Sequence, residues 1–143
     1  MTIVACVDRS KDSSEVMIEA ARLGEAFGEP VHVVHVLSRE AFLSLQRTNV
    51  SDTGKAVPVK RVKEIATEIA AEAIGKADIE AEAVGLVGEP AEEIVNYADN
   101  HDVSYVIVGG KRRSAVGKAI FGSVAQSVLT ESHQPVVVVR RPE

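Results

Sequence analysis

A chain of 143 residues, 45% of them hydrophobic and 26% charged, fits one domain, residues 1–143, that is long enough to bury a core. Aromatic residues make up only 3% and tryptophan is absent, which argues against binding of single-stranded nucleic acid through base stacking. The single cysteine, Cys6, rules out a disulfide within the chain, and no apolar run approaches the roughly 18 residues of a membrane span. We therefore expect a soluble cytoplasmic protein in which Cys6 is a small buried hydrophobe rather than a nucleophile.

The first half of the chain alternates apolar runs with helical periodicity. Thr2–Val7 predicts a strand, and Asp12 with Glu15 three residues later resembles a capping box that begins a helix. The apolar face of that helix has spacings of four, three and four residues and consists of Val16, Ala20, Leu23 and Phe27. Val31–Leu37 predicts a second strand. Residues 38–56 are polar and irregular, and we expect them to form a mobile excursion.

The second half repeats the alternation. A long helix is predicted after Pro58, with an apolar face made of Val59, Val62, Ile65, Ala66, Ile69, Ala70 and Ala73. Ile79–Val87 predicts a third strand, and a helix follows that begins at Gly88-Glu89-Pro90 and turns inward Ala91, Ile94, Val95 and Ala98. A fourth strand at 105–108, a helix from about Ser123 and a fifth strand, Val136–Val139, complete the pattern.

This order predicts an α/β fold with a doubly wound, five-stranded parallel sheet and helices on both faces. The fifth strand, Val136–Val139, is apolar on both sides and follows Pro135. As an edge strand it would invite aggregation unless covered, and pairing across a two-fold axis would cover it, so we expect a homodimer through this strand. A central buried strand would show the same residues.

A glycine-bearing basic segment, 109–123, separates the fourth strand from the last helix. The chain has a net charge of −5, yet residues 101–143 hold six Lys or Arg against three Asp or Glu, and four of the six are Lys111, Arg112, Arg113 and Lys118. Open α/β sheets bind anions at this place, where glycines allow close backbone approach and helix amides point toward the ligand. A solvated loop and an anion pocket both account for the charges. The patch is too small to predict duplex DNA binding, which needs several phosphate contacts.

Common nucleotide and catalytic motifs are missing. Glycine spacing fits neither a P-loop nor a dinucleotide-binding turn, and Asp8 lacks the acidic neighbours of a phosphorelay receiver. Ser123 is not in a nucleophile elbow and is interpreted as a helix cap. His32 and His35 have opposite orientations on one strand, so they cannot easily share an ion, and we expect no structural metal.

The spacing that does fit is Gly109, two residues, position 112, nine residues, then Gly122-Ser123. This spacing resembles the universal stress protein family, as do Val7–Ser10, the segment 88–94 and the segment 135–140. The resemblance covers the whole chain and implies a dimer with strand order 3-2-1-4-5, paired through Val136–Val139. One branch of that family binds ATP or AMP between the first and fourth strands, and another acts through protein contacts without a nucleotide.

Carried over by position, the resemblance implies a nucleotide site of nine residues. Val7 and Asp8 would border adenine and ribose, with Val36 against the base, and Asp8 would be a candidate to hold a magnesium ion that accompanies the nucleotide. The floor and the phosphate site would comprise Val108, Gly109, Gly122, Ser123 and Val124.

The ninth residue of this site is Arg112, which departs from the family pattern because it replaces the second glycine. If this position needs a positive φ, arginine costs about 1 kcal/mol and obstructs the phosphate path. If the loop reroutes, the guanidinium can bind phosphate in bidentate fashion. We predict a dimeric stress-response protein that binds AMP or ATP as a regulator rather than an enzyme, without catalytic residues. A dimeric adaptor without a nucleotide and a slow ATPase are the alternatives.

Overall fold

The computed structural model describes residues 1–8, 13–110 and 122–140. Strands and helices alternate along these residues, apart from two consecutive helices after the second strand. In chain order the elements are β1 (Thr2–Cys6), α1 (Ser14–Phe27), β2 (Val31–Leu37), α2 (Arg39–Thr53), α3 (Val59–Ala77), β3 (Glu82–Val87), α4 (Pro90–Asn100), β4 (Val103–Gly109), α5 (Ser123–Glu131) and β5 (Val136–Val139).

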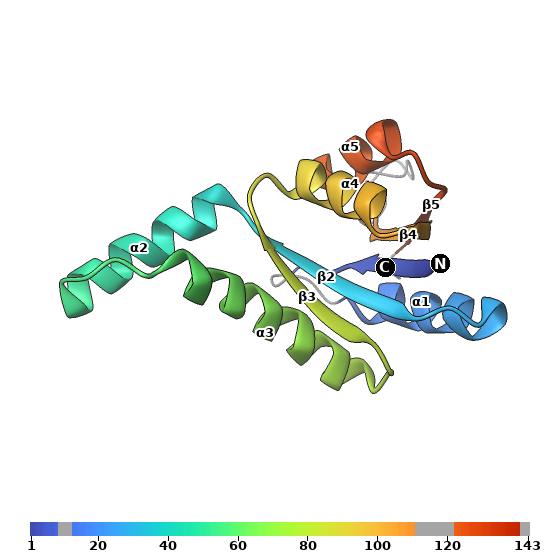
Figure 1. Cartoon of the computed structure of the whole chain (residues 1–143), viewed down its shortest axis with the longest axis horizontal. Coiled ribbons are helices and arrows are strands. Elements are labelled where there is room, and N and C mark those ends of the chain that lie inside the picture. Colours follow the sequence, from blue (N-terminus) through green and yellow to red (C-terminus); the bar gives the residue numbers. More distant parts are fainter. Residues whose placement is uncertain (9–12, 111–121, 141–143) are drawn as a thin grey trace, which may run out of the picture.

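The five strands form one sheet in the order β3-β2-β1-β4-β5, and every neighbouring pair is parallel. Helices α1 and α3 cover one face of this sheet, and α4 and α5 cover the other (Figure 1). The predicted doubly wound sheet with strand order 3-2-1-4-5 is therefore confirmed. The chain first winds outward from β1 to β3 and then crosses to β4 on the far side of β1, as right-handed crossovers require.

Both faces of the sheet are apolar because both are covered by helices. On β1, Ile3 and Ala5 join a core cluster with Val16 and Met17 of α1, whereas Val4 joins a second cluster with α4 and α5. Alternate side chains of one strand thus serve two separate cores. This explains why the strands are almost continuously apolar rather than alternating.

Pairing with neighbours sets the strand ends. The bounds of β2 and β5 agree with the sequence prediction. The third strand begins at Glu82 instead of Ile79, because its pairing with β2 begins at His32↔Glu82. The fourth strand begins earlier than expected, at Val103, where β1 supplies Thr2 as a partner. The first strand ends one residue earlier than predicted, at Cys6.

The prediction for residues 38–56 is wrong, because α2 spans Arg39–Thr53. The helix begins with the Ser38 side chain accepting a hydrogen bond from the Ala41 amide at 3.2 Å, and it ends at Gly54 with a φ of 75°. No α2 residue is fully buried, although a few apolar side chains pack beside Leu37. A strong apolar stripe is therefore missing from its sequence, and the caps mark its bounds instead.

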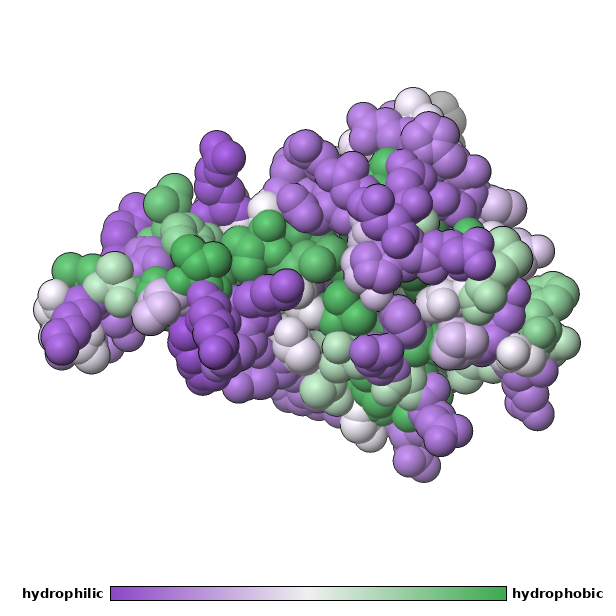
Figure 2. Space-filling model, in the orientation of Figure 1, coloured by the Kyte–Doolittle hydropathy of each residue, from purple (hydrophilic) through white to green (hydrophobic). Residues whose placement is uncertain are grey.

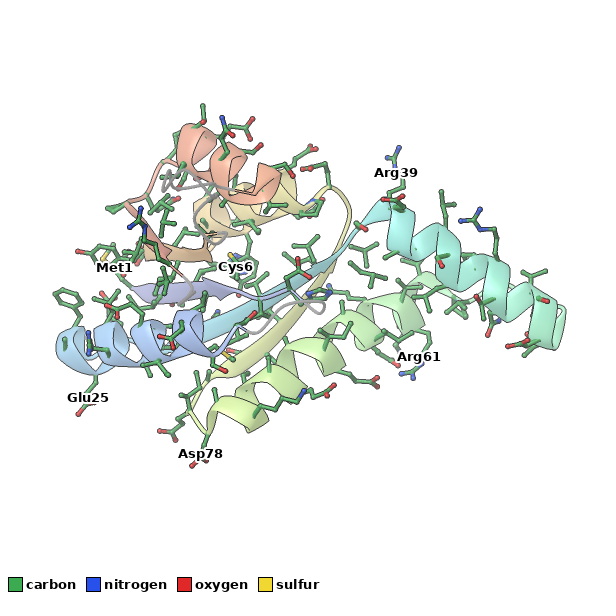
Figure 3. The ribbon with its side chains drawn as sticks, turned by 180° about the vertical axis from the view of Figure 1, so that it is seen from behind. Met1, Cys6, Glu25, Arg39, Arg61 and Asp78 are labelled. Carbon is green, nitrogen blue, oxygen red and sulfur yellow. The ribbon has the colours of Figure 1, made fainter. Side chains whose placement is uncertain are left out.

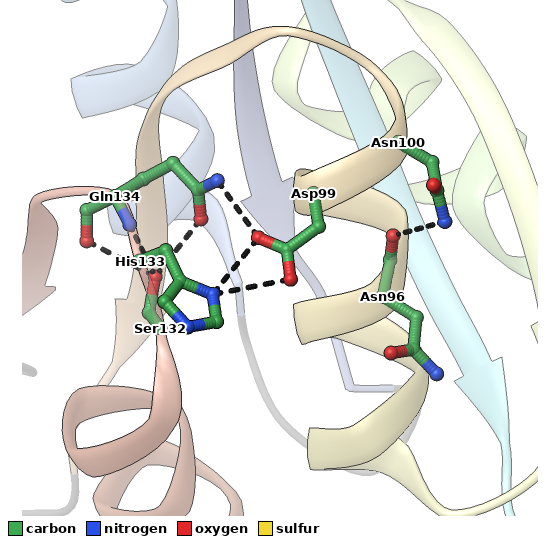
Figure 4. A network of polar contacts seen from close by, with 6 residues as sticks. All are labelled: Asn96, Asp99, Asn100, Ser132, His133 and Gln134. Atoms are coloured by element: carbon green, nitrogen blue, oxygen red, sulfur yellow. Dashed lines mark hydrogen bonds and ion pairs between the residues drawn. The ribbon is translucent and has the colours of Figure 1, made fainter.

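A polar network fixes the turn that leads into β5 (Figure 4). The Nδ1 atom of His133 lies 3.1 Å from both carboxylate oxygens of Asp99 on α4, and the amide nitrogen of Gln134 donates to Asp99 at 3.1 Å. Ser132 adds a hydroxyl bond to the Gln134 carbonyl at 3.0 Å. Hydrogen bonds from Gln134 and then His133 hold the pKa of Asp99 below its ordinary value. The network ties the edge strand to α4.

None of the helices in the part of the chain that the structure describes is long and apolar enough to cross a bilayer.

Gly85 on β3 lies in close contact with α3, and it gives a test of the fold. A Cβ there would collide with the Thr67 backbone and lie 2.6 Å from the Lys63 carbonyl oxygen, so we expect Gly85→Ala to lower the free energy of unfolding by about 2–3 kcal/mol. Gly75→Ala is the matched control, because nothing lies within 4 Å of its Cβ and alanine favours a helix interior by about 0.5–1 kcal/mol. Urea unfolding of both variants measures the difference. Equal stability of the two would contradict the close packing of α3 on β3.

Candidate functional site

A cavity of about 270 Å³ opens at the carboxyl ends of the strands, near the low end of the range of small-molecule sites, about 300–1,000 Å³. It lies where β1 is flanked by β2 and β4, the point at which the order of the strands reverses. The described residues that line it are Cys6, Val7, Asp8, Ser13, Glu15, Val16, Val34, Val36, Pro90, Ile94, Val108, Gly109, Gly122, Ser123, Val124, Ala125 and Val139.

The chain just beyond β1 is held in place by hydrogen bonds to its neighbours. The Val7 amide donates to the Val34 carbonyl at 3.0 Å, and the Val7 carbonyl accepts from Nδ1–H of His35 at 2.9 Å. His35 is only 7% exposed. The Asp8 amide then donates to the Ser13 hydroxyl, 3.4 Å away, at the start of α1. His35 and Ser13 thus fix the backbone from which the Asp8 carboxylate projects.

One side of the cavity is hydrocarbon. Val34 and Val36 of β2 face α4, whose first turn contributes Pro90 and whose second contributes Ile94. Helix α4 begins with the Glu89 side chain accepting from the Glu92 amide at 2.9 Å, and with Pro90 as its first residue. A slot between aliphatic side chains suits a flat, apolar ring better than a charged group.

The opposite side is the start of α5. Gly122 precedes the helix with extended backbone, φ −67° and ψ 161°, and accepts from the Gln126 amide at 3.0 Å. The first amides of a helix have no acceptor within the helix, and no side chain caps α5 among the described residues. Ser123 and Val124 line the cavity at this point. The helix start therefore offers amide donors and the positive end of its dipole to an anion.

Gly109 lies at the base of the cavity, at the end of β4, where α1 leaves little room for a side chain. A Cβ on Gly109 would lie 3.3 Å from Cγ2 of Val16, a tight contact, and the residue pairs with Val139 on β5. The Gly110 amide donates to the Val139 carbonyl at 2.8 Å. A side chain at Gly109 would thus push against α1, and its absence leaves the strand end open.

The charged side chains among the described lining residues are two carboxylates, Asp8 and Glu15. Arg112, the basic residue expected at the site, lies outside the described residues. Cys6, labelled in Figure 3, is half-buried at the end of β1, and burial raises its pKa to about 12. Its thiol is protonated at neutral pH and therefore a poor nucleophile, in line with its interpretation as a small hydrophobe.

The two histidines of β2 make polar contacts with different neighbours. His32 joins Tyr97 and Glu82, with Nδ1 2.7 Å from the Tyr97 hydroxyl and Nε2 3.0 Å from a Glu82 oxygen. Burial and then the Glu82 charge raise the pKa of Tyr97. His35 bonds the Val7 carbonyl instead. Within residues 1–8, 13–110 and 122–140, no three His, Cys, Asp or Glu side chains lie together so that they could hold a metal ion.

Eight of the nine residues that the sequence places at the site line this one cavity. They are Val7, Asp8, Val36, Val108, Gly109, Gly122, Ser123 and Val124. The sequence prediction missed Ile94, which it assigned only to a helix face, and Glu15, which it assigned to a capping box. Asp12, the other half of that box, lies outside the described residues, and Ser13 directly precedes the helix.

Comparisons of this chain with family models, related sequences and solved structures all point to the same family. The universal stress protein family model matches residues 1–140. The universal stress protein YxiE of Bacillus subtilis is 30% identical, with 96% of this chain and 97% of that protein covered. A solved universal stress protein from Archaeoglobus fulgidus is 33% identical with a TM-score of 0.68, covering 96% of this chain and 97% of its own. A structure of the universal stress protein from the same organism in complex with dAMP is 28% identical, with a TM-score of 0.58 and 96% of each chain covered. This chain therefore belongs to the universal stress protein family.

Proposed function

We propose that this protein binds an adenine nucleotide, AMP or ATP, in the cavity between β1 and β4, and that it acts as a cytoplasmic stress-response regulator rather than as an enzyme. One observation carries the proposal: a single cavity joins an aliphatic slot to the start of helix α5, which no side chain of the described residues caps. An adenine ring fits the first and a phosphate the second. The dAMP complex of the Archaeoglobus fulgidus relative supports the choice of an adenine nucleotide.

The nucleotide lies along the cavity in the proposed arrangement. Val36 contacts the base, and Asp8 with Val7 borders the ribose. Val108 and Gly109 form the floor on which the nucleotide rests. The amides of Gly122, Ser123 and Val124, together with the Ser123 hydroxyl, donate to phosphate oxygens. Magnesium is commonly held by one or two carboxylates plus substrate phosphates, and Asp8 is the carboxylate that we propose for it.

Gly122→Val tests the phosphate end of the cavity. The extended backbone of Gly122 accommodates valine, so the fold is retained, but the new side chain stands before the α5 amides. We expect calorimetric titration of nucleotide-free protein with AMP to show at least about tenfold weaker binding, which is about 1.4 kcal/mol. Gln126→Ala, on the exposed side of the same helix, is the control and keeps the affinity of the unaltered protein. An absence of heat with millimolar AMP and ATP and an intact fold would refute the proposal.

Arg112 decides between nucleotide binding and the adaptor alternative. We propose that its guanidinium binds phosphate, so that Arg112→Gly weakens AMP binding by about three- to tenfold and reduces its dependence on salt, while Arg112→Lys lies between. Calorimetry at two salt concentrations measures both effects. Tighter binding by the glycine variant would show that Arg112 obstructs the phosphate path. That result would favour a dimeric adaptor that works without a nucleotide, and mass spectrometry of the purified protein would then find no adenine nucleotide.

We also propose a homodimer paired through β5. Each of its four valines is only half-buried, and the strand lies at the edge of the sheet next to β4. The Pro135 carbonyl accepts a hydrogen bond from Val106 of β4, and the Val139 carbonyl accepts one from Gly110, which directly follows β4. A strand turns alternate residues toward each neighbour, so Val136 and Val138 present their backbone groups outward, where a second copy can pair.

Val138→Pro is the specific test of this pairing. It removes an outward amide without removing a hydrogen bond to β4, and proline blocks edge pairing. We expect light scattering to give twice the 15.2 kDa mass of one chain for the unaltered protein and a single chain for the variant. Val138→Thr keeps the amide and the β-branched shape, so it stays dimeric. A proline variant that remains dimeric with its fold intact would exclude β5 as the interface.

A further inference from the structure

An arm made of residues 39–63, which comprises α2, the following turn and the start of α3, extends beyond the sheet (Figure 1). Helix α2 contains no buried residue. It is attached through Ala41, Phe42 and Leu45, which pack beside the small cluster of Leu37, Val62 and Ala66. The helix thus adds little to the core, and most of its surface faces solvent.

Side-chain to backbone hydrogen bonds nevertheless give the arm a defined shape. The Gln46 amide pairs with the backbone of Val57 in both directions, donating to its carbonyl at 2.7 Å and accepting from its amide at 2.6 Å. The Asn49 amide donates to the Lys55 carbonyl at 2.5 Å, and Ser38 caps the helix start. A surface fixed in this way before contact pays less ordering entropy when a partner binds.

The outward face of α2 carries a stripe that alternates cations and aliphatic groups, here called the docking stripe: Arg39, Leu43, Arg47 and Val50. Their spacings of four, four and three residues place them on one face of the helix. Leu43 is 51% exposed and Val50 48%. Figure 2 shows hydrophobic atoms along the arm among hydrophilic ones, and Arg39 extends away from the helix in Figure 3.

The charge of the arm opposes that of the chain as a whole. Residues 39–63 hold six Lys or Arg and two Asp or Glu, whereas the chain has 16 and 21. Arg61 is already bound to Glu64 and Glu68. In the part of the chain that the structure describes, no ion pair involves Arg39 or Arg47. These two guanidinium groups are therefore free to meet carboxylates of another molecule.

We propose that the docking stripe binds an acidic amphipathic helix of a partner protein. Leu43 and Val50 lie two turns apart, which matches aliphatic residues on a facing helix, and the arginines between and beside them match its carboxylates. An anionic membrane fits less well, because the stripe has only two exposed aliphatic residues and no aromatic one, and the arm also carries Glu40 and Asp52. None of the four residues of the docking stripe lines the nucleotide cavity.

A defined peptide probe tests the proposal. The probe is a fluorescent helical peptide of about 20 residues with Leu and Glu at helical spacing, and its counterpart has Lys in place of Glu. We expect fluorescence anisotropy to show micromolar binding of the acidic peptide alone, with amide NMR shifts confined to α2. Both Arg39→Glu/Arg47→Glu and Leu43→Ser/Val50→Ser weaken binding by at least about tenfold. These positions are exposed, so circular dichroism gives unchanged melting.

Matched substitutions elsewhere serve as controls. Ile18→Ser/Leu129→Ser removes aliphatic residues that are 50% and 41% exposed, and Arg22→Glu/Lys76→Glu reverses exposed cations on other helices. Both controls retain peptide binding. The proposal is overturned if the controls lose as much as the stripe variants, or if the stripe variants still bind normally. It also fails if phosphatidylserine vesicles bind the arm and the peptide does not. A third contradicting outcome is that the stripe variants alter the oligomeric state, seen as a changed mass in solution, without weakening peptide binding.

Discussion

The reversal of strand order at β1 is the constraint on which the rest of the molecule depends. Strand β1 has β2 on one side and β4 on the other, and right-handed crossovers place α1, which follows β1, on one face of the sheet and α5, which follows β4, on the other. The helices that follow β1 and β4 therefore lie on opposite faces of the sheet, and the cavity lies between these two strand ends, as far as the described residues line it. The cavity is a consequence of this winding, and the residues that line it determine what it can hold.

Three kinds of lining residue divide the chemistry of the cavity. Aliphatic side chains such as Val36 and Ile94 supply a dry slot, the α5 start supplies amides, and Asp8 with Glu15 supplies negative charge. Two carboxylates oppose a bare phosphate, so an anion that binds here needs the helix amides, added cations or a divalent ion. This balance favours a ligand that carries an apolar ring as well as its phosphate. Free phosphate would contact the amides at the start of α5 and gain nothing from the aliphatic slot.

The structure was predicted most accurately from the sequence where a single strong sequence pattern determines it. Valine-rich runs predicted β2 and β5 with their observed bounds. The family resemblance, carried over by position, implied nine site residues, and eight of them line the cavity. Strand ends were less accurate because pairing partners set them, as at His32↔Glu82. His35 was interpreted only as part of a strand, since its bond to the Val7 carbonyl depends on a neighbour 28 residues away in sequence.

Helix α2 escaped prediction for the reason that makes it useful as a contact surface. Its order comes from Gln46 and Asn49 bonding the turn rather than from a buried apolar face, so its outward residues are not constrained by packing. The arm and the cavity nevertheless share the end of β2. Val36 lines the cavity on one side of the sheet, and the next residue, Leu37, packs beneath the arm on the other. Alternation along a strand thus joins the two surfaces through one peptide bond, and a displacement of this strand end would move both.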